Sequence, residues 1–149
     1  GRFYFMTEYI SEIFSRIHEA KNRKLKKEIL ESCKDNKVFK FVLQGTFDPS
    51  IQWTVKKIPP YIPVVDRPLD LVDVSLFGTV PKCSIFVEGH DRSKPLRAKQ
   101  SSDLLVQMLE AMHQDESKIF VGMLKKKLKV KGLTSKLVLE VFPNLYQKV

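Results

Sequence analysis

Lysine side chains crowd one stretch of the sequence, from Ser117 to Leu137, and this stretch contains no acidic residue. Gly132 lies within it, and Thr134 and Ser135 follow where a new apolar helical pattern begins. The start of a helix presents free backbone N–H groups and a partial positive charge, and both favour anions. The pattern therefore predicts a surface that binds phosphate. Its seven lysines are Lys118, Lys125, Lys126, Lys127, Lys129, Lys131 and Lys136.

Two further basic clusters lie earlier in the chain, at residues 21–27 and at Lys56-Lys57. Trp53 and Tyr61 flank the second cluster and could contact sugars or bases, although burial is the commoner fate of a tryptophan. Arginine is scarce in these clusters, and lysine is a point charge rather than a bidentate reader of base edges. The composition favours binding to a nucleic-acid backbone without sequence specificity.

The whole-chain composition agrees with this interpretation. The 149 residues include 26 basic and 17 acidic side chains, which gives a net charge of +9. Such an excess points to nucleic acid, an anionic membrane or an acidic partner. No apolar run approaches the ~20 residues needed to span a bilayer, so we expect a monomeric, soluble protein of the cytoplasm that does not enter membranes. Cys33 and Cys83 are too few and too far apart to indicate a metal site or a disulfide framework.

Six segments carry apolar residues at helical spacing, which predicts a mainly α fold, a compact bundle of about six helices. Asn22 and Thr134 are expected N-caps, and Ser101 or Ser102 is expected to cap the fourth helix with Asp103 in its first turn. The predicted helices span residues 8–17, 22–36, 38–45, 101–112, 115–129 and 134–142. We expect residues 6–149 to form one domain, and residues 1–5 to be a cloning remnant ahead of Met6.

The middle of the chain is less regular. Residues 51–58 fit either a short strand or a helical turn, and Pro59-Pro60 stops both. Further prolines interrupt residues 60–95, so long helices are not expected there. Residues 84–88 could form a strand paired with residues 72–76 as a short β-hairpin, and the alternative is an ordered loop insertion.

The chain contains no recognisable catalytic or metal-binding motif. His18, His90 and His113 have no partner at ligand spacing, and each is expected to be a surface or boundary histidine. No glycine-rich phosphate loop and no nucleophile elbow occurs. A hydrolase whose residues meet only in three dimensions is the weakest of the hypotheses that the sequence leaves open.

Three blocks of the sequence resemble the N-terminal DNA-binding domain of bacteriophage ATP-dependent DNA ligases. The first comprises ISEIF at residues 10–14 and KLKKEILESCKDN at residues 24–36, and the second is IQWTVKKIP at residues 51–59. The third is GMLKKKLKVKGLTSKLVLEVFPNL at residues 122–145, which is similar to the segment where a helix ends in a glycine turn and a new helix follows. The order and rough spacing of the three blocks match those of the ligase family. The resemblance covers about the first third and the last third of the chain.

This resemblance implies an all-helical module that grips double-stranded DNA around a nick through phosphates and the minor groove, with roles in DNA repair, replication and recombination. It implies no cofactor in this domain, because ATP and Mg²⁺ would belong to a catalytic domain. The Lys-x-Asp-Gly adenylation motif of that domain is absent here, so we expect a non-catalytic fragment. By position, the DNA contacts would be Lys125, Lys127, Lys129, Lys131, Gly132, Thr134, Ser135 and Lys136, with Lys24, Lys56 and Lys57 less securely placed.

The sequence also departs from the family. Lys127 stands where the family usually has an acid, and Lys131 is an extra residue ahead of Gly132. Residues 60–95 have no counterpart where a helix would be expected. The alternative hypothesis is a free-standing basic interaction protein that binds RNA or an acidic protein partner.

Overall fold

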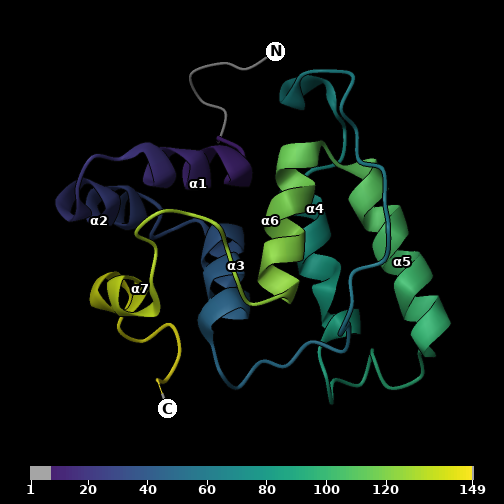
Figure 1. The fold of residues 1–149 in the computed structure, drawn as a ribbon. Helices are drawn as coiled ribbons and strands as arrows, with labels where there is room; N and C mark the ends of the chain where they lie inside the picture. The colour runs from purple at the N-terminus through teal and green to yellow at the C-terminus, as the bar shows by residue number, and fades with distance from the viewer. Residues whose placement is uncertain (1–7, 149) are drawn as a thin grey trace.

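Helices dominate the computed structural model, which describes residues 8–148 (Figure 1). Within that range the chain forms seven α-helices and two 3-10 helices and contains no β-sheet, so the predicted fold class is confirmed. The elements, in order, are α1 (Ile10–Glu19), α2 (Arg23–Ser32), α3 (Lys37–Phe47), η1 (Leu69–Leu71), α4 (Leu76–Thr79), η2 (Val80–Phe86), α5 (Ala98–Ala111), α6 (Gln114–Leu124) and α7 (Ser135–Val141). The expected cloning remnant, residues 1–5, lies outside the described residues.

Local capping chemistry sets the start of three of the helices. The side chain of Asn22 accepts a hydrogen bond from Leu25 N–H, and that of Asn36 accepts one from Phe39 N–H. Thr134 Oγ1 likewise accepts from Leu137 N–H at 3.2 Å. These bonds satisfy backbone donors that a helix leaves free in its first turn, which is why Asn and Thr are favoured there.

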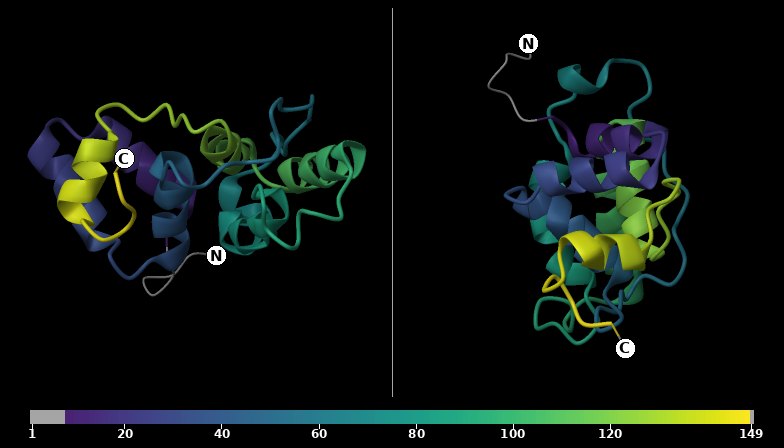
Figure 2. Two further views of the ribbon diagram at one scale, coloured as in Figure 1. Left: turned by 90° about the horizontal axis from the view of Figure 1, so that it is seen from below. Right: turned by 90° about the vertical axis from the view of Figure 1, so that its left-hand side faces the viewer.

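The helices fall into two groups that meet at α3 and α6 (Figure 2). Helices α1, α2, α3 and α7 form one half of the molecule, and α4, η2, α5 and α6 form the other. Helix α6 packs against α1, α3, α4 and α5, so it is the central element of the bundle. The long connection that follows α3 runs across the second half before the chain enters α4.

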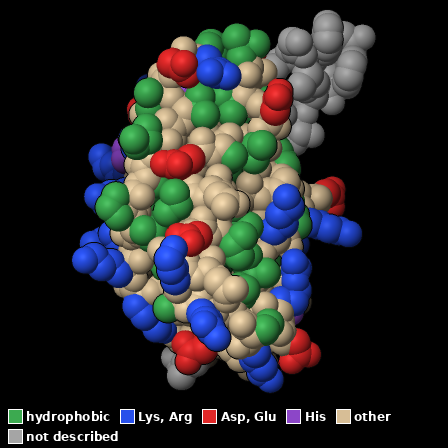
Figure 3. Space-filling view, turned by 90° about the vertical axis from the view of Figure 1, so that its right-hand side faces the viewer, with side chains coloured by type: hydrophobic (Ala, Val, Ile, Leu, Met, Phe, Trp, Pro, Cys, Tyr) green, Lys and Arg blue, Asp and Glu red, His purple; other side chains and the backbone are tan. Residues whose placement is uncertain are grey.

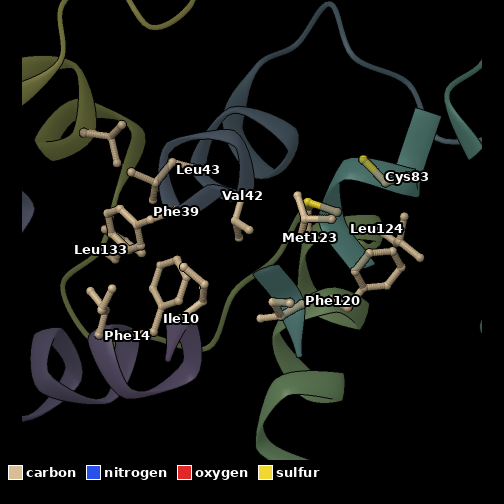
Figure 4. Close-up of a cluster of buried hydrophobic side chains, with 14 of the residues drawn as sticks. Ile10, Phe14, Phe39, Val42, Leu43, Cys83, Phe120, Met123, Leu124 and Leu133 are labelled. Atoms are coloured by element: carbon tan, nitrogen blue, oxygen red, sulfur yellow. The ribbon is translucent and has the colours of Figure 1, made fainter. Parts of the chain in front are cut away.

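One continuous apolar core joins the two halves (Figure 4). Phe14 of α1 lies against Phe39 of α3, with ring centroids 4.9 Å apart. Phe120 of α6 meets Phe86 of η2 edge-on at 6.5 Å. Both cysteine thiols are buried in this core and are free. Burial of these large side chains supplies most of the force that holds the bundle together.

Glu116 is a charged residue at the centre of the molecule and is completely buried. Its carboxylate on α6 accepts hydrogen bonds from Ser11 N–H at 2.8 Å and from Leu76 N–H at 2.9 Å. Those two donors belong to the first turns of α1 and α4. One carboxylate therefore caps two helices and ties both to a third.

The predicted β-hairpin is wrong. Residues 84–86 belong to the 3-10 helix η2, and Leu76 begins α4. Instead of pairing with each other, the two segments make isolated bridges elsewhere, Val87 with Trp53 and Val74 with Met112. A third bridge joins Val64 to His113. Residues 53–74 are thus an ordered connection that is fastened at several points to η2 and to the α5–α6 turn.

The bounds of four predicted helices also need correction. Helix α2 ends at Ser32, short of Asn36, and α3 continues past Gly45 to Phe47. Helix α5 begins at Ala98, so Ser101 and Ser102 lie inside it and do not cap it. Helix α6 ends at Leu124, so Leu128 and Lys129 lie in the non-helical connection that follows it.

Asp103 is in the middle of α5, where it pairs with Lys99. Within residues 8–148, every helix is too short or too polar to span a lipid bilayer.

Candidate nucleic-acid interface

A tight turn at the end of α6 directs the lysine-rich segment away from the helix. Lys126 has φ 57°, a left-handed conformation in which glycine is the usual residue. Lys126 N–H bonds to Met123 O at 3.0 Å and Lys127 N–H bonds to Gly122 O at 2.8 Å. This pair of bonds is the Schellman arrangement, which closes the helix and turns the chain. The lysines that follow are therefore carried on a non-helical connection.

The side chain of Lys126 fastens this turn to the end of α3. Its Nζ donates to the carbonyl oxygens of Asp48 at 2.7 Å, Ile51 at 2.8 Å and Gly45 at 3.3 Å. Burial lowers the pKa of this amine, and the Asp48 carboxylate opposes the shift. With all three donors directed at carbonyls of the protein, Lys126 is a structural clamp and is not available to bind phosphate.

The segment 127–131 alternates between solvent and core. Lys127, Lys129 and Lys131 are exposed, and Leu128 and Val130 between them are half-buried. Successive side chains of an extended chain point to opposite sides. The alternation of Lys with Leu and Val therefore holds the apolar residues against the bundle and leaves the three ammonium groups in a row toward solvent.

The segment forms one wall of a groove of about 690 Å³, whose other walls are α1 and α6. Lys118 and Lys125 enter from α6, Lys127 and Lys129 enter from the extended segment, and the aromatic Tyr61 also lines the groove. The α1 wall includes His18, whose Nδ1 accepts a hydrogen bond from Lys131 N–H at 2.9 Å. That bond holds the far end of the lysine segment beside α1.

A second hollow, of about 570 Å³, lies next to the first and shares Lys125 with it. Lys56 and Lys57 line it from the connection after α3, and Lys126 forms part of its floor. The clamp made by Lys126 brings these two clusters together, because it joins the end of α6 to the chain just before Lys56. We call the exposed lysines of the two hollows the lysine track: Lys56, Lys57, Lys118, Lys125, Lys127 and Lys129.

Most of the lysine track has no neutralising partner. Within residues 8–148, the only track lysine with a carboxylate oxygen within 4.0 Å is Lys56, which lies 3.3 Å from Glu88. Both side chains of that pair are exposed, so it neutralises little charge. Like charges held close together repel one another, and an incoming anion would relieve that repulsion.

The residues after the lysine row have partners of their own. Gly132 has φ +76°, in a turn closed by Leu133 N–H to Val130 O at 3.1 Å. A Cβ there would lie 2.7 Å from Lys26 Cε, so the close approach that this glycine permits is made by a lysine of α2. Thr134 Oγ1 caps α7, and Ser135 Oγ lies 2.6 Å from Tyr146 OH. The lysines are thus the groups best placed to hold phosphate.

Three of the predicted contact lysines lie outside the track. Lys131 is exposed at the end of the lysine segment and lines neither hollow. Lys24 and Lys136 are exposed on α2 and α7, and they also line neither hollow. Their neighbours Arg23 and Lys27 pair with Glu140 of α7. Nothing in the described structure connects these two lysines to the track, and their contact with DNA remains a prediction.

Trp53 and Tyr61 differ in exposure. Trp53 is buried, and its Nε1 donates to Gly45 O at 3.0 Å, so it belongs to the core. Tyr61 is half-buried and lines the groove. Of the three histidines, His18 and His90 are exposed, whereas His113 is buried and accepts Asp115 N–H as the cap of α6.

Lys118 belongs to the basic stretch of the sequence but is not among the predicted DNA contacts. Lys118 lies on α6 seven residues before Lys125, which is two helical turns, so both project from the same face into the groove. That spacing was a signal that could have identified Lys118. His18 had no such signal, because its partner Lys131 is 113 residues away.

Solved structures with the same arrangement of helices exist. Two chains, named Pmar-Lig_PreS3 and Pmar-Lig_Pre, each superpose on 94% of this chain with a TM-score of 0.70. This chain therefore shares its fold with part of each of these two chains. Sequence identity to each is only 15%, and this chain spans about a third of their length, 31%. No protein-family model and no curated protein matches the sequence.

Proposed function

We propose that this chain is a DNA-binding module of an ATP-dependent DNA ligase, which holds nicked duplex without sequence specificity while another domain seals the break. The observation that carries the proposal is the lysine track, six exposed lysines from separate parts of the sequence gathered along two adjoining hollows. The likeness in fold to ligase-related chains supports it. The module itself would position DNA, and ATP and Mg²⁺ would act in the catalytic domain.

Duplex phosphates are the ligand that fits such a track best. Lysine ammonium groups bind phosphate oxygens as point charges and carry little information about base sequence. A row of exposed lysines on extended chain can follow a strand of the backbone, and Lys56 and Lys57 extend the row beyond Lys125. We therefore place the sugar-phosphate backbone along both hollows, with Lys125 at the junction.

The proposal is tested by measuring the affinity for a labelled nicked duplex over a range of salt concentrations. Binding should weaken by about 0.9 log units per log unit of salt for each phosphate contacted. Replacing Lys125, Lys127 and Lys129 with Ala should weaken binding equally for unrelated sequences and reduce the salt slope. The matched control replaces Lys34, Lys82 and Lys148, which are exposed and line neither hollow.

Both triple variants lower the net charge from +9 to +6, that is, 9 − 3. If the two lose the same affinity, the chain binds through its overall charge and the track has no special role. Affinity for duplex RNA or for an acidic polypeptide that equals the affinity for DNA would favour an interaction protein instead.

A further inference from the structure

The groove between α1, α6 and residues 127–130 has a feature that binding to an intact duplex leaves unused. Beneath its lysines, the lining is largely apolar, with five half-buried side chains that face the space: Tyr61, Ile119, Val121, Leu128 and Val130. A duplex presents phosphates and sugars to a protein surface and keeps its bases stacked inside. Apolar surface of this kind contributes to binding only when the ligand has apolar faces that cover it and remove it from water.

The charges of the groove select an anionic ligand. Four lysines of the track, Lys118, Lys125, Lys127 and Lys129, line it together with two acids, Glu12 and Asp115. Glu12 is engaged at the start of α1, where it accepts Tyr9 N–H at 2.9 Å. The Asp115 side chain is exposed at the start of α6 and offsets part of the positive charge. The four lysines still leave the groove with an excess of positive charge.

An unpaired nucleotide combines the two properties, because it carries a phosphate and exposes the flat face of its base. Proteins that hold single strands join a cationic groove to aromatic or apolar surfaces on which bases stack. The groove has the size of an ordinary small-ligand site, which is about 300–1,000 Å³. Tyr61 supplies its aromatic ring, since Trp53 is buried in the core.

We propose that this groove holds a short unpaired stretch of DNA, such as a displaced end beside the nick, with its phosphates on Lys118, Lys127 and Lys129 and its bases against Tyr61 and the apolar floor. The inference rests on the proposed function. It narrows the preferred DNA ligand from any nicked duplex to a duplex with an unpaired end at the nick. The backbone of a plain nicked duplex would follow both hollows. When an unpaired end occupies the groove, Lys56 and Lys57, in the second hollow, would remain on the paired duplex.

The experiment compares the affinity of the chain for a nicked duplex with its affinity for the same duplex bearing a short 5′ or 3′ flap. Stacking contributes ~1–3 kcal/mol per base, so at least one of the flapped duplexes should bind about fivefold more tightly or better. A 2-aminopurine placed in the flap should change its fluorescence on binding. Tyr61→Leu should abolish most of the flap preference, measured as the ratio of the affinities of the same protein for the flapped and the plain duplex.

Two further variants make the result decisive. Ile62→Ala removes an exposed apolar neighbour that does not line the groove, and it should keep the flap preference. Ser15→Glu adds a carboxylate to the exposed α1 wall, where folding tolerates a polar residue, and it should reduce flap binding if Tyr61→Leu fails to fold.

Flapped and plain duplexes that bind equally well in the wild type would overturn the inference and leave the proposed function intact. A flap preference that survives both Tyr61→Leu and Ser15→Glu would overturn it as well, because the flap would then bind elsewhere. If a single strand binds and the nicked duplex does not, the proposed function fails while the groove keeps its assigned ligand. An acidic peptide that displaces the flap at equal charge would assign the groove to a protein segment instead.

Discussion

Two glycines in helices have opposite surroundings, and this difference yields a prediction at the scale of single residues. A Cβ on Gly45 of α3 would lie 2.8 Å from Met123 Sδ and 2.9 Å from the Trp53 ring. A Cβ on Gly78 of α4 would have no atom within 4 Å. Replacing glycine by alanine in a helix normally stabilises by ~0.5–1 kcal/mol. Gly78→Ala should follow that rule.

Gly45→Ala should do the reverse and destabilise the protein by ~1–3 kcal/mol, because overpacking forces Trp53 and Met123 from their places. Urea unfolding of both variants measures the difference. Equal stabilisation by the two substitutions would mean that Trp53 does not pack against α3 as described. The difference between Gly45→Ala and Gly78→Ala also tests whether the chain near Lys56 is held to α3, because Trp53 packs against Gly45.

At the scale of elements, Lys126 has a residue type that its backbone disfavours. A lysine at φ 57° costs ~1–2 kcal/mol relative to glycine, yet it gains three hydrogen bonds from a charged group, each worth ~1.5–3 kcal/mol. Lys126→Gly relieves the backbone but leaves the carbonyls of Gly45, Asp48 and Ile51 without their donor. We expect a net loss of ~2.5 kcal/mol or more in the free energy of unfolding.

Lys126→Gly should also weaken DNA binding, because the end of α6 would no longer be held to the chain before Lys56. The control is Lys34→Gly, since Lys34 is exposed in a turn and lines neither hollow. If Lys126→Gly is as stable as the wild type, the hydrogen bonds of the Lys126 side chain contribute no more free energy than its left-handed backbone costs.

Glu116 holds three helices together, because its carboxylate on α6 accepts one N–H from α1 and one from α4. In Glu116→Gln one of the two oxygens becomes an NH₂ group, which cannot accept the N–H of Ser11 or of Leu76. A buried backbone donor is then left unsatisfied, and we expect a loss of ~2–3 kcal/mol by thermal or urea unfolding. Asp115→Asn changes an exposed neighbour in the same way and should cost much less. If Glu116→Gln and Asp115→Asn lose similar free energies of unfolding, the loss comes from the removed charge and not from the broken hydrogen bond.

These elements also show what could be predicted from the sequence. The caps at Asn22 and Thr134 were predictable because donor and acceptor lie three residues apart. The start of α5 was missed because its first turn is polar and its stabilising bond, from Arg97 N–H to Gln100 Oε1, resembles loop chemistry as much as helix chemistry. The clamp at Lys126 and the cap at Glu116 join residues 40 to 105 positions apart, and no local pattern encodes such partners.

The same distinction holds for the candidate site. The lysine row was visible in the sequence as a charge run, but its extended backbone was not, because the helical spacing of Phe120, Leu124 and Leu128 continued past the true end of α6. The left-handed turn at Lys126 was hidden because glycine, its usual marker, stands six residues later. The adjoining hollows arise only when the connection after α3 folds back onto α6.

At the scale of the whole molecule, charge and apolar surface are unevenly distributed. Four of the five exposed large hydrophobic side chains belong to the connection before α4: Ile62, Val65, Leu71 and Val74. In the view of Figure 3, most Lys and Arg side chains lie in the lower half and along the left edge, whereas the top carries mainly hydrophobic and acidic side chains. A polyanion should therefore bind in one orientation rather than coat the molecule evenly.

Lysine acetylation with and without nicked duplex, mapped by mass spectrometry, tests this orientation. DNA should protect Lys57, Lys118, Lys125, Lys127 and Lys129 and leave Lys34, Lys82 and Lys148 reactive, because only the first group lines the hollows. Lys126 should react slowly in both samples, since its amine donates to three carbonyls of the protein. Raising the salt concentration should restore the reactivity of the first group as binding is lost. Uniform protection of all eight exposed lysines would show that DNA has no preferred side on this fold, which is incompatible with a module that positions a nick.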